Sequence, residues 1–160
     1  QNVPVGLEQI SNFIIATKNK RLGNEEYFTG ILTNHRLIFA PMTKEMLKEV
    51  SNISRQQAKS RSSMQVTYPY QQTYFAWGPN TILAQTPGCI VIANNSIRQI
   101  SISIVDRVSD GYANIAEFEM QILTDSGTET YRMTKRDEYI SRLVEVYHEK
   151  VRLPANYTMP

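Results

Sequence analysis

Few residues in this chain could take part in acid–base, nucleophilic or metal chemistry. The sequence contains two histidines, His35 and His148, and one cysteine, Cys89. These residues cannot supply the four Cys or His ligands of an ordinary zinc site, and one cysteine cannot form an internal disulfide. The sequence has no glycine-rich phosphate loop, nucleophile elbow or HExxH pattern. We therefore expect a protein that is not an enzyme and that holds no catalytic residue, cofactor or metal.

Each of these three residues also has a structural interpretation, without a role in catalysis or metal binding. His35 follows Asn34 in a predicted hairpin turn, where a side chain is exposed. His148 lies late in a predicted C-terminal helix, where an imidazole complements the helix dipole. Cys89 follows a Pro-Gly turn and begins a predicted strand, which favours a small buried hydrophobic side chain over a nucleophile.

Basic residues gather in two places and form a candidate surface for an anionic ligand. The formal charge of +2 is too small to attract polyanions in general. A solvated surface is the simpler interpretation, and an anionic membrane, at about 1 kcal/mol per basic residue, is the alternative. One group follows the first predicted strand, and the other falls within about 60° on one face of a predicted helix. The residues are Lys18, Lys20 and Arg21 in the first group and Lys44, Lys48, Arg55 and Lys59 in the second.

Five of the fifteen aromatic residues occur within ten positions and form a candidate partner surface. Aromatic side chains favour protein cores when buried and interfaces when exposed. The segment therefore packs on the rest of the chain, or it forms a contact with a protein partner or a second copy. Nucleic acid is not expected, because residues 66–85 contain neither Lys nor Arg. The five residues are Tyr68, Tyr70, Tyr74, Phe75 and Trp77.

The first half of the chain predicts strands followed by helices. Residues 12–18, 27–33 and 36–40 are rich in β-branched and aromatic side chains, and the last two strands are joined by a tight turn. A helical insertion follows over about 41–85. It begins with a helix that Thr43 caps and that carries its apolar residues on one face; these are Met46, Leu47, Val50 and Ile53.

The second half predicts four more strands and a closing helix. The alternation of apolar and polar residues places Ile100, Ile102 and Ile104 on one face of a strand. A hairpin turning at residues 125–127 follows, with Phe118, Met120, Ile122, Tyr131 and Met133 facing inward. Thr134 caps a helix over about 135–152, with Asp137 at its third position. The helix has one apolar stripe, formed by Tyr139, Ile140, Leu143, Tyr147 and Val151.

The run from Phe28 to Phe39, FTGILTNHRLIF, resembles the G-x-L-x-L-T-N-x-R-L-I-F hairpin of bacterial and archaeal pleckstrin-homology-like domains and the related GRAM domains. Residues 97–100 look like the later I-x-x-I strand of these families, and residues 118–133 resemble their last hairpin. The resemblance implies a mainly β fold with a seven-stranded, bent antiparallel barrel, one end of which is capped by the C-terminal helix. It also implies the binding of lipid headgroups or peptides rather than catalysis.

These observations lead to one main hypothesis and one alternative. Residues 1–160 are expected to form a single domain, a cytoplasmic, non-catalytic binding module for a protein or peptide, or a self-associating scaffold. The alternative is a peripheral-membrane module that binds anionic lipid headgroups. The second strand lacks the basic pair that phosphoinositide-binding members of the family carry, which favours the protein partner. No apolar run approaches the ~20 residues of a membrane span, and the first residues lack the pattern of a signal peptide.

Overall fold

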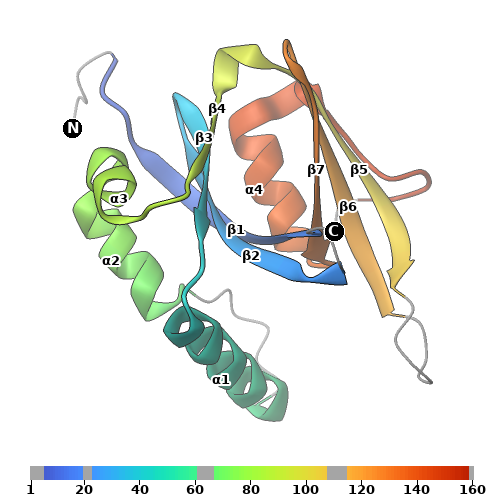
Figure 1. The fold of residues 1–160 in the computed structure, drawn as a ribbon. Helices are drawn as coiled ribbons and strands as arrows, with labels where there is room; N and C mark the ends of the chain where they lie inside the picture. The colour runs from blue at the N-terminus through green and yellow to red at the C-terminus, as the bar shows by residue number, and fades with distance from the viewer. Residues whose placement is uncertain (1–5, 20–22, 61–66, 108–114, 159–160) are drawn as a thin grey trace.

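The computed structural model of this chain describes residues 6–19, 23–60, 67–107 and 115–158. Within them, eight strands form one sheet in the order β4-β3-β2-β1-β7-β6-β5-β8 (Figure 1). The strands are β1 (Ile10–Asn19), β2 (Glu25–Thr33), β3 (Arg36–Pro41), β4 (Ile90–Ala93), β5 (Ile97–Arg107), β6 (Ile115–Thr124), β7 (Gly127–Thr134) and β8 (Val151–Arg152).

Both predicted hairpins are confirmed. β2 and β3 pair from Leu32 opposite Leu37, with the turn at Asn34 and His35, and β6 and β7 pair on either side of Asp125 and Ser126. These turns could be predicted because short polar residues that favour tight turns separate two runs of strand-forming residues.

The predicted closed barrel of seven antiparallel strands is wrong. The described sheet has eight strands and is open, with β4 at one edge and β8 at the other. β8 is the additional strand, and it pairs in parallel with β5 through Ile100 and Val151. A short turn, η2 (Asn94–Ser96), leads from β4 into β5, and these two strands do not pair within the described residues. The Tyr147 hydroxyl at the end of the C-terminal helix donates to Asn94 Oδ1 in this turn at 2.8 Å.

The helical insertion predicted between the third and fourth strands is confirmed. Thr43 caps the first helix as predicted, since its Oγ1 accepts a hydrogen bond from the Met46 N–H at 3.2 Å. The insertion helices lie on one side of β1–β3, and the C-terminal helix lies on the other, where the sheet curls around it (Figure 1). The helices are α1 (Lys44–Ser60), α2 (Pro69–Trp77), α3 (Pro79–Gln85) and α4 (Asp137–Tyr147).

The C-terminal helix is shorter than predicted and begins differently. α4 ends at Tyr147, because the backbone of His148 takes a positive φ of 51° that cannot continue a right-handed helix. Val151 therefore leaves the predicted apolar stripe and joins β8. The residue before the first turn is Arg136 rather than Thr134, and no side chain caps it.

Two hydrophobic cores share the strands β1–β3. Successive side chains of a strand point to opposite faces, so Ile14 enters one core and Phe13 the other. The inner core lies between the curled sheet and α4, and its buried residues include Ile14, Phe28, Leu37, Phe39, Phe118, Met120, Tyr131, Leu143 and Tyr147. The outer core lies between β1–β3 and the insertion, and its buried residues are Phe13, Ile31, Ile38, Ala40, Tyr68, Tyr70, Tyr74 and Ile82.

The inward alternation predicted for β6 and β7 is confirmed, whereas the alternation predicted for β5 holds only in part. Ile100 and Ile102 are buried, but Ile104 is 43% exposed. Ile104 lies beyond the two positions at which β8 pairs with β5, which are Ile100 and Ser101. Neither the α4 stripe nor β8 therefore covers the last part of this strand.

Gly30 is the point at which β1, β2 and β3 approach most closely. A Cβ atom at this position would lie 2.6 Å from Ile14 Cγ1 and 3.3 Å from Phe39 Cε1. We expect Gly30→Ala to lower the free energy of unfolding by about 1 to 3 kcal/mol through overpacking. Urea unfolding would measure the change. Ser103→Ala, at an exposed strand position, is the control and should shift stability by less than about 0.5 kcal/mol. Equal stability of the two variants would contradict the close approach.

Candidate interaction site

The aromatic segment folds as α2, which is bounded by residues suited to both ends of a helix. Pro69 occupies the first turn, where its missing N–H costs nothing. Gly78 follows the last residue with a φ of 78°, which glycine adopts without strain, and it leads directly into α3. The short link holds Trp77 at the junction of the two helices.

Three of the five aromatic residues of the candidate partner surface belong to the outer core. Tyr68, Tyr70 and Tyr74 are buried against β1–β3. The Tyr70 hydroxyl lies 2.8 Å from Thr29 Oγ1 of β2, and burial raises the pKa of Tyr70. These three side chains fasten the insertion to the sheet and are not accessible to a partner.

The other two aromatic residues remain exposed. Phe75 is 44% exposed and contacts the Phe13 ring edge-on, with ring centroids 4.8 Å apart. Trp77 is 42% exposed and lines two crevices, one of about 270 Å³ and one of about 470 Å³. Met42, Met46, Tyr74 and Pro87 contribute to the smaller crevice, and Leu7, His35, Pro79 and Asn80 to the larger one. We refer to Trp77 with Leu7, Met42, Met46 and Pro87 as the Trp77 surface.

An ion-pair network holds one wall of the larger crevice. The Arg36 guanidinium donates to both carboxylate oxygens of Glu8 and to Asn80 Oδ1, each at 2.9 Å. Glu8 also accepts a hydrogen bond from Thr33 Oγ1 at 2.7 Å. The N-terminal segment, β3 and α3 are thereby tied together beside this crevice.

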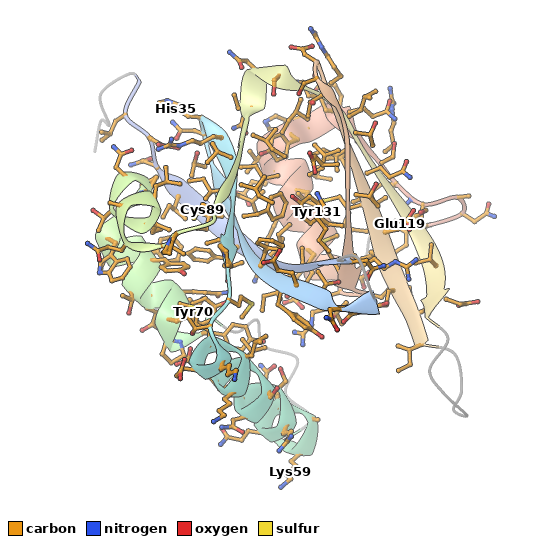
Figure 2. The ribbon with its side chains drawn as sticks, in the orientation of Figure 1. His35, Lys59, Tyr70, Cys89, Glu119 and Tyr131 are labelled. Atoms are coloured by element: carbon orange, nitrogen blue, oxygen red, sulfur yellow. The ribbon has the colours of Figure 1, made fainter. Side chains whose placement is uncertain are left out.

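Of the first basic group of the candidate anionic surface, only Lys18, near the end of β1, lies within the described residues, and the second group lies on α1. Lys18 forms an ion pair with Glu129 and lies 4.9 Å above the Tyr131 ring on the inner side of the sheet. Lys20 and Arg21 lie outside the described residues. The residues of the second group are exposed on the face of α1 turned away from the outer core, and Figure 2 shows Lys59 at the end of α1 far from the sheet. These four are Lys44, Lys48, Arg55 and Lys59.

The residues considered for catalysis lie on separate elements. His35 is exposed in the β2–β3 turn, His148 follows α4, and Cys89 precedes β4 (Figure 2). The Cys89 thiol donates to the Thr86 carbonyl at 3.2 Å, and its burial raises its pKa. Among the described residues, no group of three or more His, Cys, Asp or Glu side chains could hold a metal ion.

The basic face of α1 makes little contribution to folding, and this can be tested. We expect the combined change of Lys44, Lys48, Arg55 and Lys59 to Gln to alter the free energy of unfolding by less than about 1 kcal/mol, since exposed charges contribute little. Urea unfolding with circular dichroism would measure the difference. Arg36→Gln is the control that should destabilise, because it removes the bonds to Glu8 and Asn80. A large loss in the quadruple variant would contradict the assignment of this face to solvent.

Sequence patterns located Trp77 but not its neighbours. Leu7, Met42 and Pro87 come from three segments, and no periodicity links them to α2. Among the neighbours of Trp77, only Met46 could be identified as a packing residue from the sequence, because it belongs to the apolar face of the first insertion helix. The crevices form because the chain ends α2 at Gly78 and returns through α3 to β4.

Comparison with known proteins gives little further information. No protein-family model matches the chain, and no curated protein matches its sequence. Among solved structures, the hSac2 domain from the human phosphoinositide phosphatase Sac2 superimposes with a TM-score of 0.44 and 6% identity, over 99% of this chain and 83% of that one. A likeness of this size assigns neither a family nor a ligand. In the described part of the chain, no helix is both long enough and apolar enough to span a membrane.

Proposed function

We propose that this chain is a non-catalytic, pleckstrin-homology-like binding module that holds a protein partner at the Trp77 surface. The observation that carries the proposal is the position of Trp77, a large aromatic side chain left 42% exposed between two crevices. Tryptophan is enriched among the residues that dominate binding energy at protein interfaces. The antiparallel strand order from β4 to β5 and the helix against the concave face support the pleckstrin-homology-like part of the proposal, although the sheet is open.

The two crevices differ in chemistry and suggest the kind of segment that binds. Met42, Met46 and Pro87 make the smaller crevice apolar, and methionine adapts its shape to different apolar side chains. Glu8 and Asn80 give the larger crevice hydrogen-bonding groups. A partner segment would place an apolar side chain beside Trp77 and a polar group next to the Arg36 network.

Replacing Trp77 tests the proposal directly. We expect Trp77→Ala to weaken partner binding at least tenfold, because a truncated interface tryptophan costs about 2 kcal/mol or more. Proteins captured by the immobilised wild-type chain would be titrated into the wild type and into Trp77→Ala, and the two affinities would be compared. Leu153→Ala is the matched control, since Leu153 is also an exposed apolar residue but lies after β8. Equal binding by wild type and Trp77→Ala would refute the proposed site.

Fluorescence of Trp77, the only tryptophan, distinguishes a foreign partner from a second copy. A blue shift that appears on adding the captured partner to a monomer supports a different protein. A blue shift that appears with concentration, together with dimer formation in sedimentation, indicates self-association through the same surface. Emission that stays red-shifted and quencher-accessible in both experiments would exclude the Trp77 surface from either contact.

The exposed basic face of α1 supports a second candidate function, the binding of anionic membranes. Co-sedimentation with vesicles containing phosphatidylserine would test it. Salt-sensitive binding by the wild type that is lost in the folded quadruple Gln variant would replace the protein-partner proposal with a peripheral-membrane one. Absence of vesicle binding by the wild type would remove this candidate.

A further inference from the structure

A third hollow lies between α1 and the start of α4, and it shares no residue with the two crevices beside Trp77. It is a groove of about 370 Å³, within the range of about 300 to 1,000 Å³ typical of small-molecule sites. β1, β2, α1, the residue before α2, and the β7–α4 junction all contribute to it. Its lining residues include Ile15, Leu47, Val50, Tyr68, Arg136 and Tyr139.

The floor of the groove is apolar. Ile15 of β1 is half-buried and packs against both the inner and the outer core, and Val50 of α1 packs against the outer core. Leu47, one turn earlier on α1, is also half-buried and lines the groove. An apolar group placed here would extend a surface that already continues into both cores.

Two tyrosine hydroxyls meet this floor, and one has no partner. Tyr139 is only 5% exposed, yet its hydroxyl forms no hydrogen bond with any described residue. Unlike the Tyr131 hydroxyl, which is sealed in the interior, it reaches the groove. Burial raises the pKa of Tyr139 to about 12, so the hydroxyl keeps its proton at neutral pH and can donate a hydrogen bond. The buried Tyr68 hydroxyl has only Ser54 Oγ near it, at 3.5 Å, which is the outer limit of a hydrogen bond.

A basic side chain, Arg136, also lines the groove. Its guanidinium forms an ion pair with Glu138 at 3.6 Å, which is longer than a hydrogen bond. Glu138 is shared with Arg142 at 4.0 Å, and Asp137 accepts a hydrogen bond from Tyr157. The first turn of α4 has no side-chain cap, and it carries two carboxylates, Asp137 and Glu138, at the end of the helix that favours negative charge.

We propose that this groove binds a carboxylate-ended amphiphile, whose acyl chain lies over Ile15, Leu47 and Val50 and whose carboxylate accepts hydrogen bonds from Tyr139, Tyr68 and Arg136. A carboxylate can accept hydrogen bonds from all three groups, because a guanidinium only donates and a tyrosine hydroxyl can donate. A negative charge is favoured by the Arg136 guanidinium. The proposal stands apart from the Trp77 surface, since the two sites have no residue in common.

Calorimetric titration with sodium octanoate tests the proposal. We expect saturable binding of one octanoate per chain, and at least tenfold weaker binding of octanol, which lacks the carboxylate, and of propionate, which lacks the chain. Octanoate should shift the NMR signals of the Ile15, Leu47 and Val50 methyl groups. No saturable binding, equal binding of octanol, or shifts confined to other methyl groups would each overturn the proposal.

Three substitutions make the test specific. Tyr139→Phe keeps the buried ring and removes only the hydroxyl, and Arg136→Gln removes the charge; each should weaken octanoate binding at least fivefold. Tyr131→Phe is the matched control, because it also removes a buried, unpartnered hydroxyl but lies outside the groove, and its affinity should equal that of the wild type. Thermal melting would verify that all three remain folded. Unchanged affinity in both groove variants would overturn the assignment of the carboxylate to Tyr139 and Arg136.

Discussion

Leu143→Ala and Ile82→Ala should each lower the free energy of unfolding by about 2 to 5 kcal/mol, with a single cooperative transition in both variants. Leu143 of α4 is fully buried in the inner core, and Ile82 of α3 is fully buried in the outer core. Because β1–β3 contribute side chains to both cores, loss of either core removes support from the same strands. Urea unfolding followed by circular dichroism and by Trp77 fluorescence would measure the effect.

Comparison of the two probes decides whether the insertion belongs to the same folding unit as the sheet. Thr81→Ala, on the exposed face of α3, serves as the control and should change stability by less than about 0.5 kcal/mol. A near-neutral Ile82→Ala would contradict the outer core. An earlier Trp77 transition, separate from the loss of the sheet, would instead make the insertion an independent unit.

A steep loss of stability above pH 10 is the second large effect that we expect. Burial raises the pKa of Tyr139 to about 12, and it also raises those of Tyr70, Tyr131 and Tyr147 above the ordinary value of 10. Below pH 10 these tyrosines are neutral in both states, so they make no difference to the pH dependence. Above pH 10 the unfolded chain releases their protons while the folded chain retains them, which favours unfolding.

The size of the alkaline effect follows from the proton balance. At pH 11 each of the four tyrosines should remove about 1.4 kcal/mol of stability, or about 5 to 6 kcal/mol together. Urea unfolding at intervals between pH 8 and pH 11 would measure it. A stability that stays constant to pH 11 would contradict the burial of these hydroxyls.

Tyr131→Phe provides a clean control for the alkaline effect. The Tyr131 hydroxyl is buried and has no hydrogen-bond partner among the described residues, while its ring stacks on Phe39 with centroids 4.0 Å apart. Removal of the hydroxyl should therefore raise stability at pH 7 by about 1 kcal/mol and reduce the loss at pH 11 by about the same amount. Destabilisation at neutral pH would indicate that this hydroxyl has a partner.

Much of the local structure could be predicted because it depends on residues close in the chain. The β2–β3 turn at Asn34, the Thr43 cap and the alternation of β6 and β7 all follow from short-range periodicity and turn chemistry. The end of α4 could not be predicted in this way. The apolar spacing of Val151 suits a helix as well as a strand, and its pairing with Ile100 depends on the position of β5.

The candidate sites depended more strongly on tertiary structure. The five aromatic residues in Tyr68–Trp77 indicated that some of these rings are buried, but the composition did not indicate which ones. The fold of α2 against β1–β3 buries Tyr70 and Tyr74, four residues apart on one helix face, and leaves Trp77 at the end of the helix beside Gly78.

The sequence by itself determined the strands other than β8, the hairpins, the helical insertion and the few side chains capable of chemistry, because each depends on neighbouring residues. Tertiary structure alone decided that the sheet stays open, that β1–β3 are buried on both faces, and that Tyr139, Leu47 and Arg136 line one groove. These features arise where segments far apart in the chain meet. The physical reason is that the burial of a side chain and its hydrogen-bond partners depend on contacts between distant segments. Local periodicity does not determine which surfaces come into contact.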